Sequence, residues 1–477
     1  MKQFYFIGIG GTAMASVAAA LRQRGDAVSG SDNALYPPMS TFLEQRGIQW
    51  SEGFDAARID ALAEDTVIVV GNAISRGNAE LEAVLRSRRP YTSLAALAGG
   101  ELIGGRNSVV IAGTHGKSTT SSLTAWVLEA AGRKPGFLIG GIPENFGMGC
   151  RPAQAGGVFV TEGDEYDTAF FDKRSKFVHY HPDVAVLNNI EFDHADIFDN
   201  LAQVKKSFRQ FINLVPDNGI ILANGDDHHV LEVVHDAPAP VLLFGFGYRN
   251  MLRARDIRFM DGQTAFTMFD KNHADEYRFR IPLAGEFNVR NALAAIAVAK
   301  HLGADDDAIQ RGFATFRSIK RRMEVIAEHG GITLIDDFAH HPTALSATLT
   351  ALREKYPGRR LIACFEPRSN TTTRSIYQHE ITDALALADV AVIGAIDRPQ
   401  RYAENERLST DRVARDLEAH GLLARSIPDA AEMVEWVADI ARPGDVIALC
   451  SNGRFGGAHA LLRQRIEQRD GTQTPYS

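Results

Sequence analysis

The chain has 477 residues, of which 45% are hydrophobic and 23% charged, a composition typical of a globular protein of about three domains. Its formal net charge of -8 argues against nucleic acid as a partner, because phosphate backbones are bound by basic surfaces. Three widely separated cysteines (Cys150, Cys364 and Cys450) form no zinc-type pair and indicate reduced thiols in a cytoplasmic protein.

The N-terminal segment predicts a strand at Phe4–Ile9 and a helix at Ala13–Arg24. The glycines between them interrupt the apolar run, which argues against a secretory signal peptide. No other stretch approaches the roughly 18 apolar residues that span a bilayer, so no membrane partner is expected. Further strands are predicted at Ala27–Gly30 and Thr66–Val70.

The loop after the first strand resembles a dinucleotide-binding fingerprint. It reads Gly8-Ile9-Gly10-Gly11-Thr12-Ala13, and Asp32 follows the next predicted strand, where a dehydrogenase places its ribose-binding acid. Taken alone, the pattern favours an NAD-linked oxidoreductase. A second phosphate loop further along the chain makes another interpretation better, namely a domain that binds the pyrophosphate of a different nucleotide.

A glycine-rich segment, residues 98–106, is expected to join the first unit to a second, which begins with the strand Ser108–Ala112. The loop Gly113-Thr114-His115-Gly116-Lys117-Ser118-Thr119-Thr120 then opens a helix, the context of a phosphate loop. Glycines let backbone N–H groups approach phosphate, Lys117 supplies charge, and the Ser118 hydroxyl can reach magnesium. Because Ile111 replaces the first glycine of the Walker A pattern, this is a shorter variant of that loop.

Two polar clusters follow apolar strands of the second unit. Residues 162–167 (Glu-Gly-Asp-Glu-Tyr-Asp) follow Val158–Val160, and residues 188–196, which include Asp193 and His194, follow the strand Val184–Asn188. Strand ends of open α/β sheets gather ligand groups, and carboxylates suit magnesium. A solvated acidic loop and a structural histidine are the alternatives.

The remaining pattern alternates helices and strands, which predicts α/β domains with mainly parallel sheets. In the second unit we expect a helix at Leu201–Leu214, antiparallel hairpins over Met251–Phe269 and a helix at Val289–Leu302. A third unit is expected to begin near Lys320-Arg321-Arg322. Its predicted strands are Ile332–Ile335, Leu361–Phe365, Val390–Ile393 and Val446–Leu449, and Asp470–Ser477 is expected to be a frayed tail.

Three motifs together resemble the Mur ligases, over essentially the whole chain and in the family's order. They are Gly113 to Thr120, Asp193-His194, and Asp336-Asp337-Phe338-Ala339-His340-His341-Pro342. Ser118 stands where threonine is common and Gly163 where alanine is usual, and neither departure removes a functional group. The family resemblance implies an ATP- and Mg²⁺-dependent ligase that activates a carboxylate as an acyl phosphate and couples it to an amine.

Four stretches resemble most the members that join UDP-N-acetylmuramate to L-alanyl-γ-D-glutamyl-meso-diaminopimelate, a tripeptide recovered from old cell wall. They are residues 36–41 (Tyr-Pro-Pro-Met-Ser-Thr), residues 71–78 (Gly-Asn-Ala-Ile-Ser-Arg-Gly-Asn), residues 170–180, and residues 366–371 (Glu-Pro-Arg-Ser-Asn-Thr). The stretch over residues 170–180 argues against relatives that use L-alanine alone or a folate glutamate tail. The presence of Lys117, Glu162 and His194 argues against a regulator that binds ATP without turnover.

The resemblance also implies three domains. These are a Rossmann-like UDP-sugar-binding domain (residues 1–105), a central P-loop ATPase-type domain with a mainly parallel sheet (106–318), and a Rossmann-like domain (319–477) that binds the amine substrate. The oligomeric state is not predicted. Some family members carry a carbamylated lysine, and the spacing selects neither Lys205 nor Lys206 for that role.

Residue roles follow from the resemblance, position by position. The expected catalytic residues are Lys117, Glu162, His194, Asp337 and His340, and the expected magnesium ligands are Ser118, Glu162 and His194. The expected ATP-binding residues are Gly113, Thr114, His115, Gly116, Lys117, Ser118, Thr119, Asn288, Asn291 and Arg322. The expected UDP-sugar-binding residues are Gly8, Gly10, Gly11, Thr12, Asp32, Asn72 and Asn78, and those for the tripeptide are Arg368 and Asn370.

Three of these residues have structural alternatives. Asn288 could instead cap a helix, Arg322 could be a solvated linker charge, and Arg368 could be a turn residue.

Overall fold

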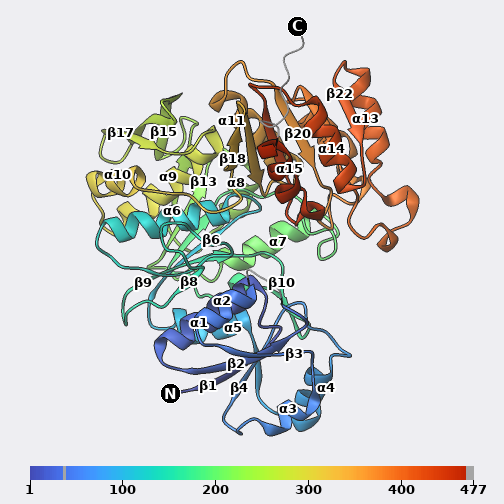
Figure 1. Cartoon of the computed structure of the whole chain (residues 1–477). Coiled ribbons are helices and arrows are strands. Elements are labelled where there is room, and N and C mark those ends of the chain that lie inside the picture. The colour runs from blue at the N-terminus through green and yellow to red at the C-terminus, as the bar shows by residue number, and fades with distance from the viewer. Residues whose placement is uncertain (36–38, 469–477) are drawn as a thin grey trace.

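The computed structural model describes residues 1–35 and 39–468, which build three α/β units stacked along the molecule (Figure 1). Two predicted features lie outside the described residues. They are the expected frayed tail, residues 470–477, and the Tyr-Pro-Pro part of the first specificity stretch, residues 36–38. Each unit has its own main sheet, and the chain runs from one unit to the next without returning.

The first unit is a five-stranded parallel sheet in the order β3-β2-β1-β4-β5. This order confirms the predicted Rossmann-like fold. Its strands are β1 (Gln3–Ile7), β2 (Ala27–Asp32), β3 (Gln49–Glu52), β4 (Val67–Val70) and β5 (Tyr91–Ser93). Its helices are α1 (Thr12–Arg24), α2 (Met39–Gln45), α3 (Ala56–Ala61), α4 (Ala79–Ser87) and α5 (Leu94–Ala98).

The glycine-rich junction between the first two units is largely helical. A π-helical turn, Gly99–Ile103, continues α5 directly. A Cβ atom at Gly99 would lie 2.1 Å from the carbonyl oxygen of His179, so glycine allows the turn to approach the second unit closely. One apolar core cluster accordingly includes Leu21 of the first unit and Phe177 of the second.

The second unit contains a ten-stranded sheet in the order β17-β16-β15-β14-β13-β12-β6-β9-β7-β8. Strands β15 through β7 of this order pair in parallel, whereas β17 and β16 at one edge and β8 at the other pair antiparallel. The central strand β12 is buried along its whole length, which explains its continuous apolar sequence. The mainly parallel sheet and the hairpins expected over 251–269 are therefore confirmed.

The elements of the second unit mostly lie within a few residues of the predicted ones. The main-sheet strands are β6 (Asn107–Ala112), β7 (Gly136–Leu138), β8 (Cys150–Arg151), β9 (Val158–Gly163), β12 (Val184–Leu187), β13 (Ile220–Asn224), β14 (Val241–Gly245), β15 (Leu252–Met260), β16 (Gln263–Asp270) and β17 (Asp275–Ile281). A small separate hairpin joins β10 (Asp167–Ala169) and β11 (Asp172–Ser175). The helices are α6 (Lys117–Ala130), α7 (Leu201–Ile212), α8 (His228–Val234), α9 (Glu286–His301) and α10 (Asp306–Ala314).

The third unit has a six-stranded sheet in the order β18-β19-β23-β20-β21-β22, parallel except for the edge strand β18. Its strands are β18 (Glu324–His329), β19 (Ile332–Asp337), β20 (Leu361–Phe365), β21 (Val390–Ile393), β22 (Leu423–Ser426) and β23 (Val446–Cys450). Its helices are α11 (Pro342–Lys355), α12 (Gln378–Leu385), α13 (Thr410–Ala419), α14 (Ala430–Ile440) and α15 (Ala458–Glu467). The two apolar core clusters of this unit consist of residues from 323 onward, so its seam with the second unit is mainly polar.

Candidate active site

The phosphate loop connects β6 to α6 and is shaped by two glycines. Gly113 has φ 138° and Gly116 has φ 82°, backbone angles that side chains disfavour. The N–H of Thr114 donates to the carbonyl of Asn189 (3.1 Å), and the N–H of His115 donates to Oδ1 of Asn189 (2.7 Å). The loop is therefore fixed to the end of β12, which carries the second polar cluster.

Lys117 is partly buried at the start of α6 and is held by one carbonyl and one carboxylate. Its Nζ donates to the carbonyl of Gly113 (2.7 Å) and to Oε2 of Glu165 (2.8 Å). Burial alone would lower the pKa of Lys117, but the carboxylates of Glu165 and Asp164 outweigh burial and raise that pKa. The side chain is therefore a fixed positive charge at the mouth of the loop.

The acidic cluster after β9 faces that charge. Glu162 accepts hydrogen bonds from the backbone N–H of Gly140 (2.7 Å) and the hydroxyl of Ser118 (3.0 Å). Burial, with Asp164 nearby, raises the pKa of Glu162. Burial would also raise the pKa of Asp164, yet Lys176 at 3.1 Å, together with Lys117, lowers it overall. Two partly buried lysines are thus paired with three acids beyond the end of β9.

His194 lies on the other side of this cluster. Its φ is 55°, and its Nε2 is 3.6 Å from Oε1 of Glu165. The neighbouring Asp193 accepts a hydrogen bond from the Thr371 hydroxyl of the third unit (2.6 Å) and lies 3.9 Å from Nε2 of His340. The second polar cluster therefore forms part of the seam between the second and third units.

Many of these groups line one cavity of about 1130 Å³, which is large enough for a nucleotide and part of a second substrate. Thr12 from the first unit, the phosphate loop of the second unit and Asp337 of the third unit contribute to its wall. The cavity also contains the other expected catalytic residues, which are Lys117, Glu162, His194 and His340. Ser118 and Glu162 present hard oxygen atoms close together at its wall, a donor set that fits Mg²⁺.

All the residues expected near ATP except Gly113 line the cavity, but several have partners within the protein. Asn288 donates to the carbonyl of Ala284 (2.8 Å), and Asn291 accepts from the hydroxyl of Thr120 (3.1 Å). The helix α9 begins at Glu286 with Gly285 as its N-cap, so Asn288 does not cap it. Arg322 is partly buried in the cavity wall, with its guanidinium 4.9 Å from the centre of the Phe338 ring, and burial lowers the pKa of that group.

Asp337 is held by backbone groups of the third unit. Its oxygens accept from the N–H groups of Met323 (2.7 Å) and Ala339 (2.8 Å), while burial raises the pKa of the carboxyl group. His340 lies beside it, and one of its ring nitrogens is 3.0 Å from the carbonyl of Phe338. The end of β19 and the residues that follow it therefore position both side chains at the cavity wall.

The residues expected to bind the UDP-sugar are arranged around β1, β2 and β4. Asp32 accepts from the backbone N–H of Gly10 (2.7 Å) and so holds the glycine loop. Asn72 donates to the carbonyl of Asp167 in the second unit (3.1 Å). Asn78 caps α4 by accepting from Glu80 and Leu81. Gly8, Gly10, Gly11 and Thr12 form the turn between β1 and α1.

Arg368 and Asn370, expected to bind the tripeptide, follow β20 in the third unit. Arg368 lies 3.8 Å from Glu366 and covers Gly453, and Asn370 accepts from Arg401 (3.3 Å). Neither is among the described residues that line the cavity. They adjoin it through Thr371, which contacts Asp193.

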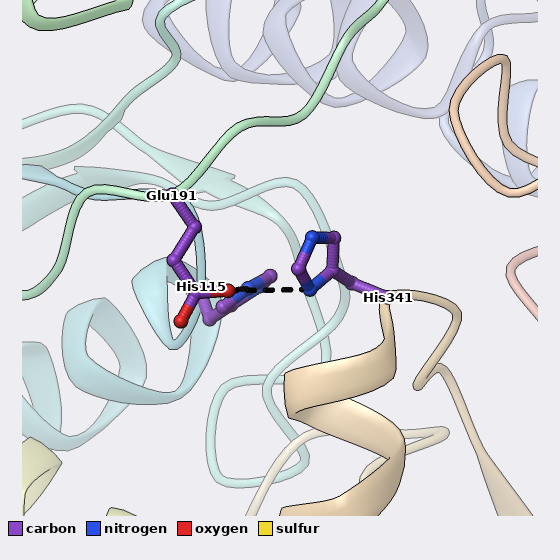
Figure 2. A group of neighbouring side chains, drawn as sticks. All are labelled: His115, Glu191 and His341. Atoms are coloured by element: carbon purple, nitrogen blue, oxygen red, sulfur yellow. Dashed lines mark hydrogen bonds and ion pairs between the residues drawn. The ribbon is translucent and has the colours of Figure 1, made fainter. Parts of the chain in front are cut away.

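Several important contacts were not predicted from the sequence. Glu165 and Lys176 lie within the stretches 162–167 and 170–180 that the sequence analysis singled out. Nothing in the sequence distinguished these two residues from their polar neighbours. A second unpredicted group joins His115, Glu191 and His341, which point toward one another across the seam (Figure 2). Burial lowers the pKa of His341 to about 4, and the pKa of Glu191 is about 2, because hydrogen bonding to His115 outweighs burial.

Three family descriptions match consecutive parts of the chain. They are the Mur ligase family catalytic domain over residues 3–102, the Mur ligase middle domain over 111–299, and the Mur ligase glutamate ligase domain over 321–453. Among the described residues, no helix is long and apolar enough to cross a membrane.

Individual proteins match over almost the whole chain. A UDP-N-acetylmuramate–L-alanyl-γ-D-glutamyl-meso-2,6-diaminoheptandioate ligase of Escherichia coli K12 is 39% identical, covering 98% of this chain and 99% of that protein. A UDP-N-acetylmuramate–L-alanine ligase of Burkholderia cenocepacia J2315 is 35% identical, with coverages of 98% and 99%. The crystal structure of a murein peptide ligase from Psychrobacter arcticus 273-4 has 32% identity and a TM-score of 0.74, covering 98% and 99% of the two chains.

Proposed function

The chain belongs to the Mur ligase family, an ATP-dependent family of amide-bond-forming ligases, and we propose that it joins UDP-N-acetylmuramate to L-alanyl-γ-D-glutamyl-meso-diaminopimelate. The full-length relative that carries this activity in its name and the murein peptide ligase structure support this choice of substrates. The observation that carries the proposal is the position of Lys117, whose ammonium group lies between the phosphate loop and the acidic cluster.

The first step, in this proposal, forms an acyl phosphate. The lactyl carboxylate of UDP-N-acetylmuramate attacks the γ-phosphorus of ATP, and ADP leaves. Two anions must meet, so fixed positive charge is needed at the site. Lys117 provides it when its Nζ exchanges Glu165 for a phosphate oxygen, and the loop N–H groups at the start of α6 bind the other phosphates.

Magnesium is proposed to bind at Ser118, Glu162 and His194. The first two already meet at 3.0 Å, and His194 is on the facing side of the same cavity. Mg²⁺ bound there would neutralise charge on the phosphate oxygens. Arg322, partly buried in the cavity wall, is proposed to approach the same phosphates, with Asn288 and Asn291 beside the adenine.

In the second step, the α-amine of the tripeptide attacks the acyl carbon and inorganic phosphate leaves. Asp337 and His340 are proposed to face this amine, and Arg368 and Asn370 to bind the peptide beyond the cavity. The first unit, with Gly8, Gly10, Gly11, Thr12, Asp32, Asn72 and Asn78, is proposed to bind the UDP moiety. We also propose that residues 1–105, 106–318 and 319–477 are three separate domains, and that the enzyme acts in the cytoplasm on recycled wall peptide.

Product analysis tests this proposal. Mass spectrometry of a reaction with UDP-N-acetylmuramate, ATP, Mg²⁺ and tripeptide should detect a product equal in mass to the two substrates minus one water. Omission of ATP or of either substrate should abolish it. A full reaction that yields no such product would refute the proposed activity.

A further inference from the structure

Three potential metal ligands meet at the seam between the second and third units (Figure 2). His115 comes from the phosphate loop, Glu191 follows β12, and His341 is the N-cap of α11. Oε2 of Glu191 lies 3.2 Å from Nε2 of His115 and 3.3 Å from Nδ1 of His341. All three candidate ligand atoms lie within 4.8 Å of one another.

The two separations from Glu191 suit a small tetrahedral ion. Bonds of about 2.0–2.2 Å from Zn²⁺ to nitrogen and oxygen place neighbouring ligand atoms about 3.3–3.6 Å apart in a tetrahedral site. Both nitrogen–oxygen separations of the cluster agree with that edge length. Mg²⁺ favours oxygen ligands in an octahedral arrangement, so two imidazoles select a different class of cation.

The hydrogen bonds of His341 point to a cation beside it. Nε2 lies 3.3 Å from the carbonyl oxygen of Phe192, which can only accept, so Nε2 carries the ring proton and Nδ1 has the lone pair. The N–H of Thr343 makes a long contact with Nδ1 (3.4 Å), which a bound metal ion would replace as the partner of that lone pair. In this tautomer, the Nδ1 lone pair and the Glu191 carboxylate face each other, an unfavourable arrangement that a cation between them relieves.

The surroundings of the cluster are those of a metal site. Histidine ligands of metals usually donate their second ring N–H to a carbonyl or carboxylate, as His341 does to Phe192. Tyr377 donates to that same carbonyl (2.6 Å), and the Thr343 hydroxyl donates to Oε2 of Glu191 (2.7 Å). His341 is almost completely buried, so its ring orientation is fixed.

We propose that His115, Glu191 and His341 bind a divalent transition-metal cation such as Zn²⁺, at a site separate from the proposed Mg²⁺ ligands. Two ligands belong to the second unit and one to the third, so a bound ion ties α11 to the phosphate loop. Binding therefore requires the arrangement in which the two units meet, and it stabilises that arrangement. The inference rests on the cluster alone and does not depend on the proposed substrates.

Cobalt titration of the full-length protein without ATP or Mg²⁺ tests the site. We expect one Co²⁺ per chain with the visible absorption of four-coordinate cobalt, displaced by one equivalent of Zn²⁺. Glu191→Gln keeps the side-chain shape and should weaken Co²⁺ binding by about 10-fold or more, as should His341→Ala. Zn²⁺ should also raise the melting temperature of the wild type but not of Glu191→Gln.

Two controls separate this site from others. His194→Ala removes a proposed magnesium ligand, and the double variant His228→Ala/His229→Ala removes an adjacent histidine pair elsewhere on the second unit. Both should bind Co²⁺ like the wild type. Loss of binding in either control, unchanged binding in a folded Glu191→Gln variant, or no stoichiometric binding by the wild type would each overturn the proposal. If His341→Ala does not fold, Glu191→Gln alone decides.

Discussion

The hydroxyl of Ser118 donates a 3.0 Å hydrogen bond to Oε2 of Glu162, a residue 44 positions further along the chain. The contact joins the first turn of α6 to the end of β9, because β6 and β9 are parallel neighbours in the central sheet. Two oxygen ligands suited to Mg²⁺ are thereby held together by the sheet itself, before any nucleotide binds.

Substitution of this pair should change the magnesium requirement. Glu162→Gln removes the charge that attracts the cation, so the Mg²⁺ concentration for half-maximal ADP release should rise by roughly 10-fold or more. Ser118→Ala should act in the same direction, whereas Ser118→Thr keeps the hydroxyl and should preserve the wild-type requirement. A Glu162→Gln enzyme with wild-type Mg²⁺ dependence would exclude Glu162 as a ligand.

Lys117→Ala should lower kcat by on the order of 10³-fold, because the γ-phosphate would lose its fixed counter-charge. Lys300→Ala is the matched control, since Nζ of Lys300 pairs with Asp306 (2.9 Å) and Lys300 does not line the cavity. Steady-state ADP release measures both variants, and circular dichroism establishes that both are folded. A similar loss of activity in both would show that the effect is not specific to the phosphate loop.

Gly116→Ala should disrupt the phosphate loop. The residue has φ 82°, and an added Cβ would lie 2.5 Å from Oδ1 of Asn291, so the loop must shift and ATP affinity should fall. Gly132 has a similar φ of 75° but open space around it, and Gly132→Ala should cost only about 1–2 kcal/mol of stability. Isothermal titration with an ATP analogue compares the two; equal affinities would contradict the close approach of Asn291.

In metal-free protein, kept so with a chelator, stability should fall with acidification partly because of His341. Burial lowers the folded-state pKa of this ring from 6.5 to about 4. Between these values the unfolded chain binds a proton that the folded chain excludes, so the free energy of unfolding falls as pH falls through this window. The loss is on the order of 2–3 kcal/mol at pH 4. Well above pH 6.5 the ring is neutral in both the folded and the unfolded state, so it does not make the free energy of unfolding depend on pH.

His341→Asn isolates this contribution, because asparagine can still cap α11 but does not titrate. Urea unfolding at several pH values between 4 and 7 should give a shallower pH dependence for the variant than for the wild type. Parallel curves would show that His341 is protonated alike in the folded and unfolded states.

The sequence revealed those features that depend on local order. The strand before Gly113, the turn and the helix from Lys117 are consecutive, so one stretch of sequence specifies them. Buried parallel strands such as β12, β20 and β21 were also recognisable from continuous apolar runs. Short edge strands such as β8 and β22 were not predicted, because two to four partly exposed residues carry little periodic signal.

Contacts across the seam could not be predicted. Thr371 meets Asp193, and His341 meets Glu191, only because the third unit docks on the end of β12. Similarly, Glu165 rather than Glu162 pairs with Lys117, a choice that depends on how the chain leaves β9. Among several acids in one short stretch, packing decides which one reaches the lysine.

The most direct test of the account compares two amine substrates with one enzyme preparation. ADP release is measured with UDP-N-acetylmuramate, ATP and Mg²⁺, adding either L-alanyl-γ-D-glutamyl-meso-diaminopimelate or free L-alanine. The account predicts turnover with the tripeptide, no turnover above background with L-alanine, and none with either amine for Lys117→Ala. Turnover with L-alanine but not with the tripeptide would contradict the proposed specificity while leaving the family and the fold unchanged.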